Sequence, residues 1–169
     1  HLTTRRQRQM CIRDRLNFVE GDFEKGVEVL LQWMDEVEVI TAQGWSLLAQ
    51  AYFQIGSEKK SANEKYDLYE KALDSMLSAV KTAEIEDYKP KENWYVLMAA
   101  CYSELESRIG KDQSLYKQLD IYEILVNLYP KKMYFLQLGG IYGQLNREVD
   151  YMTTLNAAYQ KDLLDKQGE

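Results

Sequence analysis

The chain of 169 residues holds few of the side chains on which most enzyme chemistry depends. It has one histidine, His1, and two cysteines, Cys11 and Cys101. A serine or cysteine nucleophile is commonly activated by a histidine, so only His1 could serve such a site. Zinc sites need several cysteine or histidine ligands close together, and the sequence has no such group. We therefore expect a protein that is not an enzyme and that has no metal site or cofactor.

Proline and long apolar runs are also scarce. The two prolines, Pro90 and Pro130, leave most of the chain open to long helices, since proline is the residue that breaks them. No run approaches the ~18–20 apolar residues that a transmembrane helix needs. The sequence thus predicts helices that do not insert into a membrane.

The first fifteen residues stand apart from the rest, because they contain five arginines. Residues 5–14 (RRQRQMCIRD) resemble, codon by codon, the translation of a transposase sequencing adapter, and Arg15 and His1 fit the same reading frame. The alternative is a basic N-terminal arm or a targeting peptide. Segments of artificial origin take no part in a native fold. We expect residues 1–15 to be adapter-derived, either disordered or a helical extension, and residues 16–169 to be a fragment of the native protein.

The remaining chain is strongly acidic. The whole sequence has 21 Lys and Arg against 27 Asp and Glu, and without residues 1–15 the balance is 16 against 26. This excess of negative charge repels the phosphates of nucleic acids and the anionic surface of a membrane. We expect neither as a partner. Without residues 1–15 the chain also has no histidine, and Cys101 is its one cysteine.

A pattern of five residue types occurs three times along the chain. In each copy an aromatic residue is followed, at intervals of three, one, three and three residues, by an aliphatic, a small, a tyrosine and another aliphatic residue. The copies are Trp45, Leu48, Ala49, Tyr52 and Ile55; Tyr95, Met98, Ala99, Tyr102 and Leu105; and Phe135, Leu138, Gly139, Tyr142 and Leu145. These intervals place the five side chains on one face of a helix. The small residue indicates that a partner helix approaches closely there.

Each of these helices is followed by a second segment with helical apolar spacing. The apolar residues of these segments are Ala72, Met76 and Ala79; Tyr122, Leu125 and Leu128; and Leu155 and Ala158. Pro130 ends the middle segment, because proline disfavours a helical residue before it. Upstream, residues 20–26 resemble the turn between two paired helices. Leu30 and Trp33 would then form the core of an initial repeat whose first helix is missing.

Together these features resemble tetratricopeptide repeats over residues 16–162. The usual period is 34 residues, whereas Trp45 and Tyr95 are 50 apart and Tyr95 and Phe135 are 40 apart. The extra length falls in residues 57–69, which keep helical spacing and would extend the paired helices. It also falls in residues 107–113, where Gly110 indicates a longer turn.

The resemblance implies an all-α fold: an α-α superhelix, a TPR-like solenoid of antiparallel helix pairs, with about three full repeats and a partial N-terminal one. A single repeat cannot bury its apolar face alone. Stacking stabilises the array, at about 25 cal/mol for each Å² removed from water. We expect residues 16–169 to form one such domain.

Other candidates for chemistry have simpler structural interpretations. Cys101 lies in an apolar helical run and is expected to be a small buried side chain. Residues 139–143 (GGIYG) are glycine-rich, but a phosphate-binding loop needs a strand before it and a turn, and this segment lies inside a predicted helix. We expect close packing and a shallow groove floor there. The many carboxylates are expected to form a solvated face.

Function would then rest on the concave surface, which the first helix of each pair lines with the side chains that face away from its partner. By spacing, the predicted groove residues are Gln43, Ser46, Gln50 and Phe53; Asn93, Val96, Ala100 and Ser103; and Met133, Leu136, Gly140 and Gly143. An extended or helical peptide would lie along this groove, with Phe53 and Leu136 against its apolar side chains. The alternative is that several of these residues pack against neighbouring repeats.

Two longer stretches carry a closer resemblance. Residues 88–105 (YKPKENWYVLMAACYSEL) and residues 125–145 (LVNLYPKKMYFLQLGGIYGQL) resemble tetratricopeptide proteins of Gram-negative bacteria that are encoded beside TonB energy-transduction components. The resemblance implies a periplasmic accessory of the TonB–ExbB–ExbD machinery and a protein partner. It implies no catalytic residues.

Two further interpretations of function stay open. One is a generic assembly chaperone, cytoplasmic or periplasmic, that uses the same groove. The other is a noncatalytic repeat arm of a larger enzyme. A catalytic domain continuous with this chain would favour the arm, whereas neighbouring transport genes would favour the TonB accessory.

Overall fold

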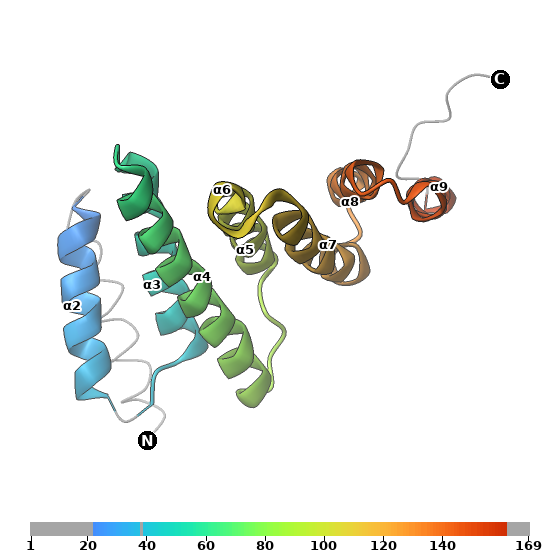
Figure 1. Cartoon of the computed structure of the whole chain (residues 1–169). Coiled ribbons are helices and arrows are strands. Elements are labelled where there is room, and N and C mark those ends of the chain that lie inside the picture. Colours follow the sequence, from blue (N-terminus) through green and yellow to red (C-terminus); the bar gives the residue numbers. More distant parts are fainter. Residues whose placement is uncertain (1–21, 38, 162–169) are drawn as a thin grey trace. The chain divides into compact units, whose positions relative to one another are not determined.

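The computed structural model describes residues 22–37 and 39–161, and all regular secondary structure in these ranges is helical (Figure 1). The all-α fold class that the sequence predicts is therefore confirmed. The adapter-like residues 1–15 lie outside the described residues, and so do Glu20 and Gly21. Within the described ranges, no helix is long and apolar enough to cross a membrane.

The helices belong to two compact units, divided between Pro90 and Lys91. The first unit contains α2 (Phe23–Glu36), α3 (Ala42–Glu58) and α4 (Ala62–Ile85). The second unit contains α5 (Glu92–Glu104), α6 (Glu106–Ile109), α7 (Lys111–Leu128), α8 (Lys132–Gln144) and α9 (Glu148–Gln160). Helices that follow one another in each unit pack as adjacent pairs. A superhelix through both units and a single domain over residues 16–169 stay predictions.

Side-chain caps fix where the first two helices of the first unit begin. The carboxylate of Asp22 accepts a hydrogen bond from the backbone N–H of Lys25 at 3.1 Å, at the start of α2. The hydroxyl of Thr41 accepts one from the backbone N–H of Gly44 at 3.2 Å, at the start of α3. Both caps satisfy backbone donors that have no partner within the helix.

The core of the first unit forms where α2 and α4 pack against α3. Leu30 and Trp33 of α2 are buried, as the sequence predicts for the initial repeat. Ala72, Met76 and Ala79 of α4 are fully buried, which confirms that this helix turns its predicted face to its partner. The predicted helical extension over residues 57–69 is also confirmed, because α3 continues to Glu58 and α4 begins at Ala62.

Two predicted connections need correction. Residues 23–26 were expected in a turn but form the first turn of α2, because Asp22 caps the helix directly before them. Residues 107–113 were expected as a longer turn but contain most of the short helix α6 and the start of α7. Gly110 separates the two helices with a φ of 92°, a left-handed backbone conformation that glycine adopts at little cost.

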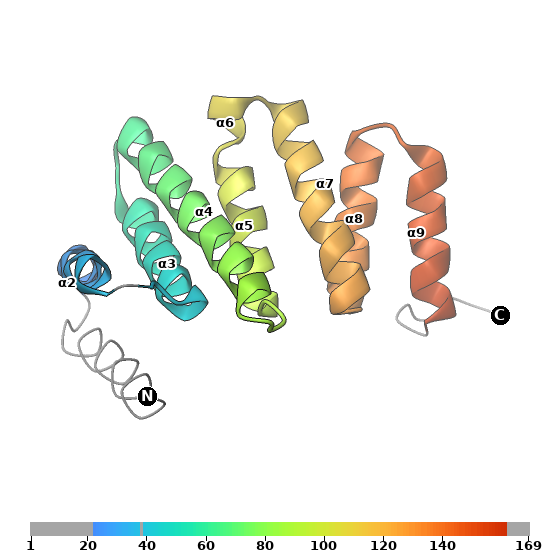
Figure 2. The ribbon, with the colours of Figure 1, turned by 90° about the horizontal axis from the view of Figure 1, so that it is seen from below.

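In the second unit α5 packs against α7, α7 against α8, and α8 against α9, as Figure 2 also shows. Tyr95 and Phe135, the first residues of the second and third pattern copies, are both buried. Gly139 is buried as well, and a methyl group there would lie 3.3 Å from the Tyr151 ring of α9. The predicted close approach of a partner helix at this small residue is confirmed.

Candidate functional site

Four residues with spacings of three, four and three form one exposed stripe on α8, which we call the α8 face: Met133, Leu136, Gly140 and Gly143. The side chains of Met133 and Leu136 are 57% and 48% exposed. Gly140 and Gly143 are also exposed, and a methyl group at either would meet open space. Packing within the described chain therefore does not require glycine at these two positions.

The corresponding residues of α5 form a similar stripe. Asn93, Val96 and Ser103 are exposed, and Ala100 is half-buried. Like the α8 face, this stripe contains no charged side chain. The predicted groove residues of the second unit are thus accessible to a partner.

The predicted groove residues of α3 are less accessible. Ser46 is fully buried, and its hydroxyl donates a hydrogen bond to the carbonyl oxygen of Gln43 at 2.9 Å. Phe53 is half-buried, and its ring centroid lies 5.1 Å from that of Tyr69 in α4. Of this set only Gln50 is exposed, with its amide donating to the Ser46 carbonyl oxygen. The placement of Ser46 on an open groove was wrong, because α3 is covered by both α2 and α4.

A carboxylate joins the N-terminal ends of α5 and α8. Glu92 accepts a hydrogen bond from the Lys131 ammonium at 2.8 Å and another from the Tyr134 hydroxyl. The hydrogen bonds from Lys131 and then Tyr134 hold the pKa of the Glu92 carboxyl below its ordinary value. Burial and the bond to Glu92 raise the pKa of Tyr134 to about 12. These hydrogen bonds link the first residue of α5 to the start of α8.

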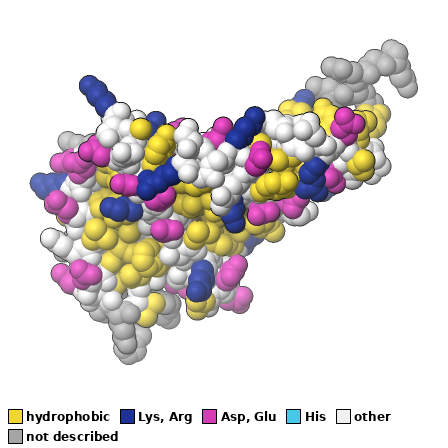
Figure 3. Space-filling model, in the orientation of Figure 1, with side chains coloured by type: hydrophobic (Ala, Val, Ile, Leu, Met, Phe, Trp, Pro, Cys, Tyr) yellow, Lys and Arg dark blue, Asp and Glu magenta, His cyan; other side chains and the backbone are white. Residues whose placement is uncertain are grey.

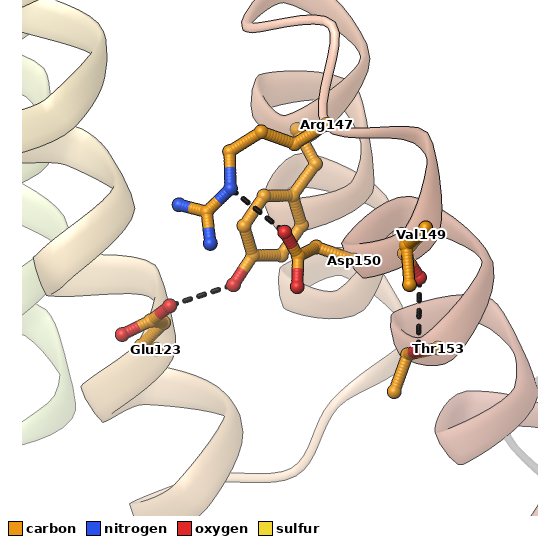
Figure 4. Close-up of polar contacts among 6 residues, drawn as sticks. Glu123, Arg147, Val149, Asp150 and Thr153 are labelled. Carbon is orange, nitrogen blue, oxygen red and sulfur yellow. Dashed lines mark hydrogen bonds and ion pairs between the residues drawn. The ribbon is translucent and has the colours of Figure 1, made fainter.

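A second polar cluster connects α7, α8 and the start of α9 (Figure 4). The Tyr142 hydroxyl donates to the Glu123 carboxylate at 2.6 Å. The Arg147 guanidinium lies 4.9 Å from the centroid of the Tyr142 ring and donates to Asp150 at 2.7 Å. Burial, followed by the hydrogen bond to Glu123, raises the pKa of Tyr142 to about 12. The sequence pattern includes Tyr142, but it contains no signal for the acceptor on the preceding helix.

The free energy of unfolding should decrease at alkaline pH because of Tyr142. An unfolded tyrosine loses its proton near pH 10.0, whereas folded Tyr142 keeps it until about pH 12. Between these values the unfolded state binds fewer protons than the folded state, so the free energy of unfolding decreases as pH rises. Denaturant midpoints measured from pH 8 upward should drop above about pH 10, and Tyr142→Phe should make the drop shallower.

The exposed Tyr116→Phe is the matched control for Tyr142→Phe, since Tyr116 lies on α7 with 52% of its side chain exposed. It should leave the alkaline drop unchanged. If both substitutions made the alkaline drop in the denaturant midpoint equally shallower, the Tyr142–Glu123 hydrogen bond would not be the cause of that drop.

Cys101 is fully buried in α5 and is not part of either exposed stripe. Burial raises the pKa of its thiol to about 12. Reactive cysteines need an accessible thiolate. The structure therefore confirms Cys101 as a small buried side chain.

Charges are mixed over the face of the molecule that Figure 3 displays. Lysine and arginine side chains alternate there with aspartate and glutamate, and hydrophobic side chains lie between them. A nucleic-acid interface needs basic side chains gathered in a patch or stripe. The displayed face has no such patch.

Comparison with known proteins gives no match: no family model, curated protein or solved structure is similar to this chain. The resemblance to tetratricopeptide proteins of TonB systems thus stays a prediction. The α8 face and the α5 stripe of the same unit are the candidate site that the geometry provides.

Proposed function

We propose that this protein is a noncatalytic scaffold that binds a segment of another protein on the α8 face. The observation that carries the proposal is the pair of exposed glycines inside α8. Glycine in a helix interior costs about 0.5–1 kcal/mol relative to alanine. Packing within the chain explains the glycine at position 139, since the Tyr151 ring occupies the space that a side chain there would need. Among the described residues nothing occupies the corresponding space at Gly140 or Gly143, and close approach by a partner explains both glycines.

The neighbouring side chains support the same function. Met133 and Leu136 are large apolar side chains that are exposed to solvent on the same stripe as the glycines. Covering them would gain about 25 cal/mol for each Å² of apolar surface. The glycines would let the partner backbone approach α8, while Leu136 and Met133 would pack against its side chains. This combination suits protein binding and supplies no catalytic group.

The sequence resemblance supplies a candidate for the partner. A periplasmic accessory of the TonB–ExbB–ExbD system would use the α8 face to hold a component of that machinery. An assembly chaperone or the repeat arm of a larger enzyme would use the same face for other proteins. The α8 face is common to all three proposals, and the identity of the captured protein separates them.

Site-specific crosslinking tests the site and the partner together. A photo-crosslinking amino acid at position 136 should capture a TonB-system protein in the envelope of a Gram-negative host. The same amino acid at Met152, an exposed apolar position of α9 (63% exposed), is the matched control and should not. Leu136→Asp should weaken the captured complex by about thirtyfold, the loss of one interface hot spot. Equal capture from both positions would contradict the site, and capture of unrelated proteins alone would contradict the TonB proposal.

A further inference from the structure

One side of α9 is largely apolar and exposed. Its residues, which we call the α9 stripe, are Val149, Met152, Asn156 and Tyr159, at intervals of three, four and three residues. The side chains of Val149, Met152 and Tyr159 are 78%, 63% and 48% exposed, and Asn156 is exposed between them. We propose that the α9 stripe is a self-association surface, on which α9 of a second copy of the chain packs as a symmetric helix pair. This inference is independent of the binding function of the α8 face.

The helix α7 shows what the same spacing does when another helix covers it. Three residues of α7 have the spacing of the last three residues of the α9 stripe: Leu119, Glu123 and Val126. Glu123 accepts a hydrogen bond from Tyr142 of α8, so this side of α7 faces that helix, and Leu119 and Val126 are buried. The one described helix against which α9 packs extensively is α8, as Figure 2 also shows. The α9 stripe therefore has the composition of a helix-packing face, and no described helix covers it.

The spacing of the α9 stripe suits pairing with its own copy. Alternating intervals of three and four are those of a coiled-coil seam, whose contact residues occupy alternating a and d positions. Val149 and Asn156 would take the a positions, and Met152 and Tyr159 the d positions. A single Asn at an a position pairs with the same residue of the partner helix, because each amide can both donate and accept a hydrogen bond. Asn156 thereby fixes the register of the two copies.

Charge also favours a second copy as the occupant. Only two residues of α9 are charged, Glu148 and Asp150, both in its first turn, and Asp150 is paired with Arg147. Residues 151–160 carry no charge, although 28% of the chain is charged and its net charge is −6. Two copies of so acidic a chain repel each other over most of their surfaces. The α9 stripe lets them meet without charged groups in the contact.

The area of the contact sets its strength. From Val149 to Tyr159 the stripe is about 15 Å long at 1.5 Å per residue, and a helix is about 10 Å wide. A contact of this size buries on the order of 300–400 Å² per copy, roughly half of the ~800 Å² per partner that is usual in stable complexes. We therefore expect a reversible dimer with a Kd on the order of 100 μM, not an obligate dimer.

Analytical ultracentrifugation of the whole chain tests the proposal. From about tenfold below to about tenfold above this Kd, the mass of the wild-type protein should rise from that of a monomer to that of a dimer. Asn156→Lys and Asn156→Asp should each weaken the dimer by at least about tenfold, since each places two like charges together in the contact. An equimolar mixture of the two variants should recover it as a heterodimer. Asn127→Lys and Asn127→Asp, at an exposed position of α7, are the matched controls and should leave the Kd unchanged.

The mixture separates pairing from damage to the fold, because two damaged variants would not restore each other. A wild-type chain that stays monomeric over this range would overturn the proposal, and so would Asn156 variants that dimerise as tightly as the wild type. Growth beyond a dimer would show a head-to-tail contact between different surfaces and would overturn the symmetric pair. A photo-crosslinking amino acid at position 152 that captures a different protein, and not a second copy, would identify another occupant and would also overturn it.

Discussion

A Trp94→Ala variant is expected to lose about 3–5 kcal/mol of its free energy of unfolding, the usual cost of removing a large aromatic side chain from a core. Trp94 is fully buried in α5. A cavity of this size cannot close by small movements of rigid helices, so the lost contacts are not recovered. This is a large part of the roughly 5–15 kcal/mol by which most domains are stable.

Urea denaturation followed by circular dichroism measures the loss, and hydrogen exchange locates it. Because Trp94 belongs to the second unit, amide protection should fall over residues 91–161 and remain over residues 22–90. Tyr116→Ala removes an aromatic side chain of the same unit that is 52% exposed, and it should cost far less. Equal loss of protection in both units would show that they unfold as one body.

The buried helical faces of the second and third pattern copies were predictable from the sequence because their signal is local. The intervals of three, one, three and three residues place the pattern residues on one helical face. Tyr95 and Phe135 are accordingly both buried. Gly139 was predictable for the same reason, since a small residue at a fixed place in the pattern indicates a close partner helix. The structure adds which ring fills the space, that of Tyr151.

Features that depend on contacts between helices were not predictable in this way. Spacing assigned Ser46 to an open face, but α3 is covered on two sides and Ser46 is buried. Trp94, which is buried beside Tyr95, is not part of the repeated pattern. The Tyr142–Glu123 hydrogen bond joins residues 19 apart on neighbouring helices. Each depends on how helices are arranged in space, which a one-dimensional pattern does not contain.

The candidate site was predictable as a set of positions but not as a surface. Spacing selected Met133, Leu136, Gly140 and Gly143 correctly as one exposed stripe of α8. It could not separate Gly139, which is needed for packing, from Gly140 beside it, because adjacent helical residues differ in direction by about 100°. Only the positions of neighbouring atoms show which glycine the fold requires.

Alanine substitutions at these two adjacent glycines are expected to have different effects on stability. Gly140→Ala should raise the free energy of unfolding by about 0.5–1 kcal/mol, because alanine favours the helix and its methyl group meets open space. Gly139→Ala brings the same helical preference but places a methyl group 3.3 Å from the Tyr151 ring. Overpacking of this kind costs about 1–3 kcal/mol, so this variant should be less stable than Gly140→Ala. Thermal and urea denaturation measure the stability of both variants.

Binding should respond to Gly140→Ala in the direction opposite to stability. If the partner backbone lies against α8, the added methyl group holds it away. The affinity for the protein that is captured by crosslinking from position 136 should then fall by about tenfold, as for other overpacked contacts. A variant that is more stable and yet binds more weakly cannot be explained by damage to the fold. Gly143→Ala should behave in the same way, one turn further along the helix. Unchanged affinity in both variants would mean that the partner does not approach the backbone of α8 and that the exposed glycines have no part in binding.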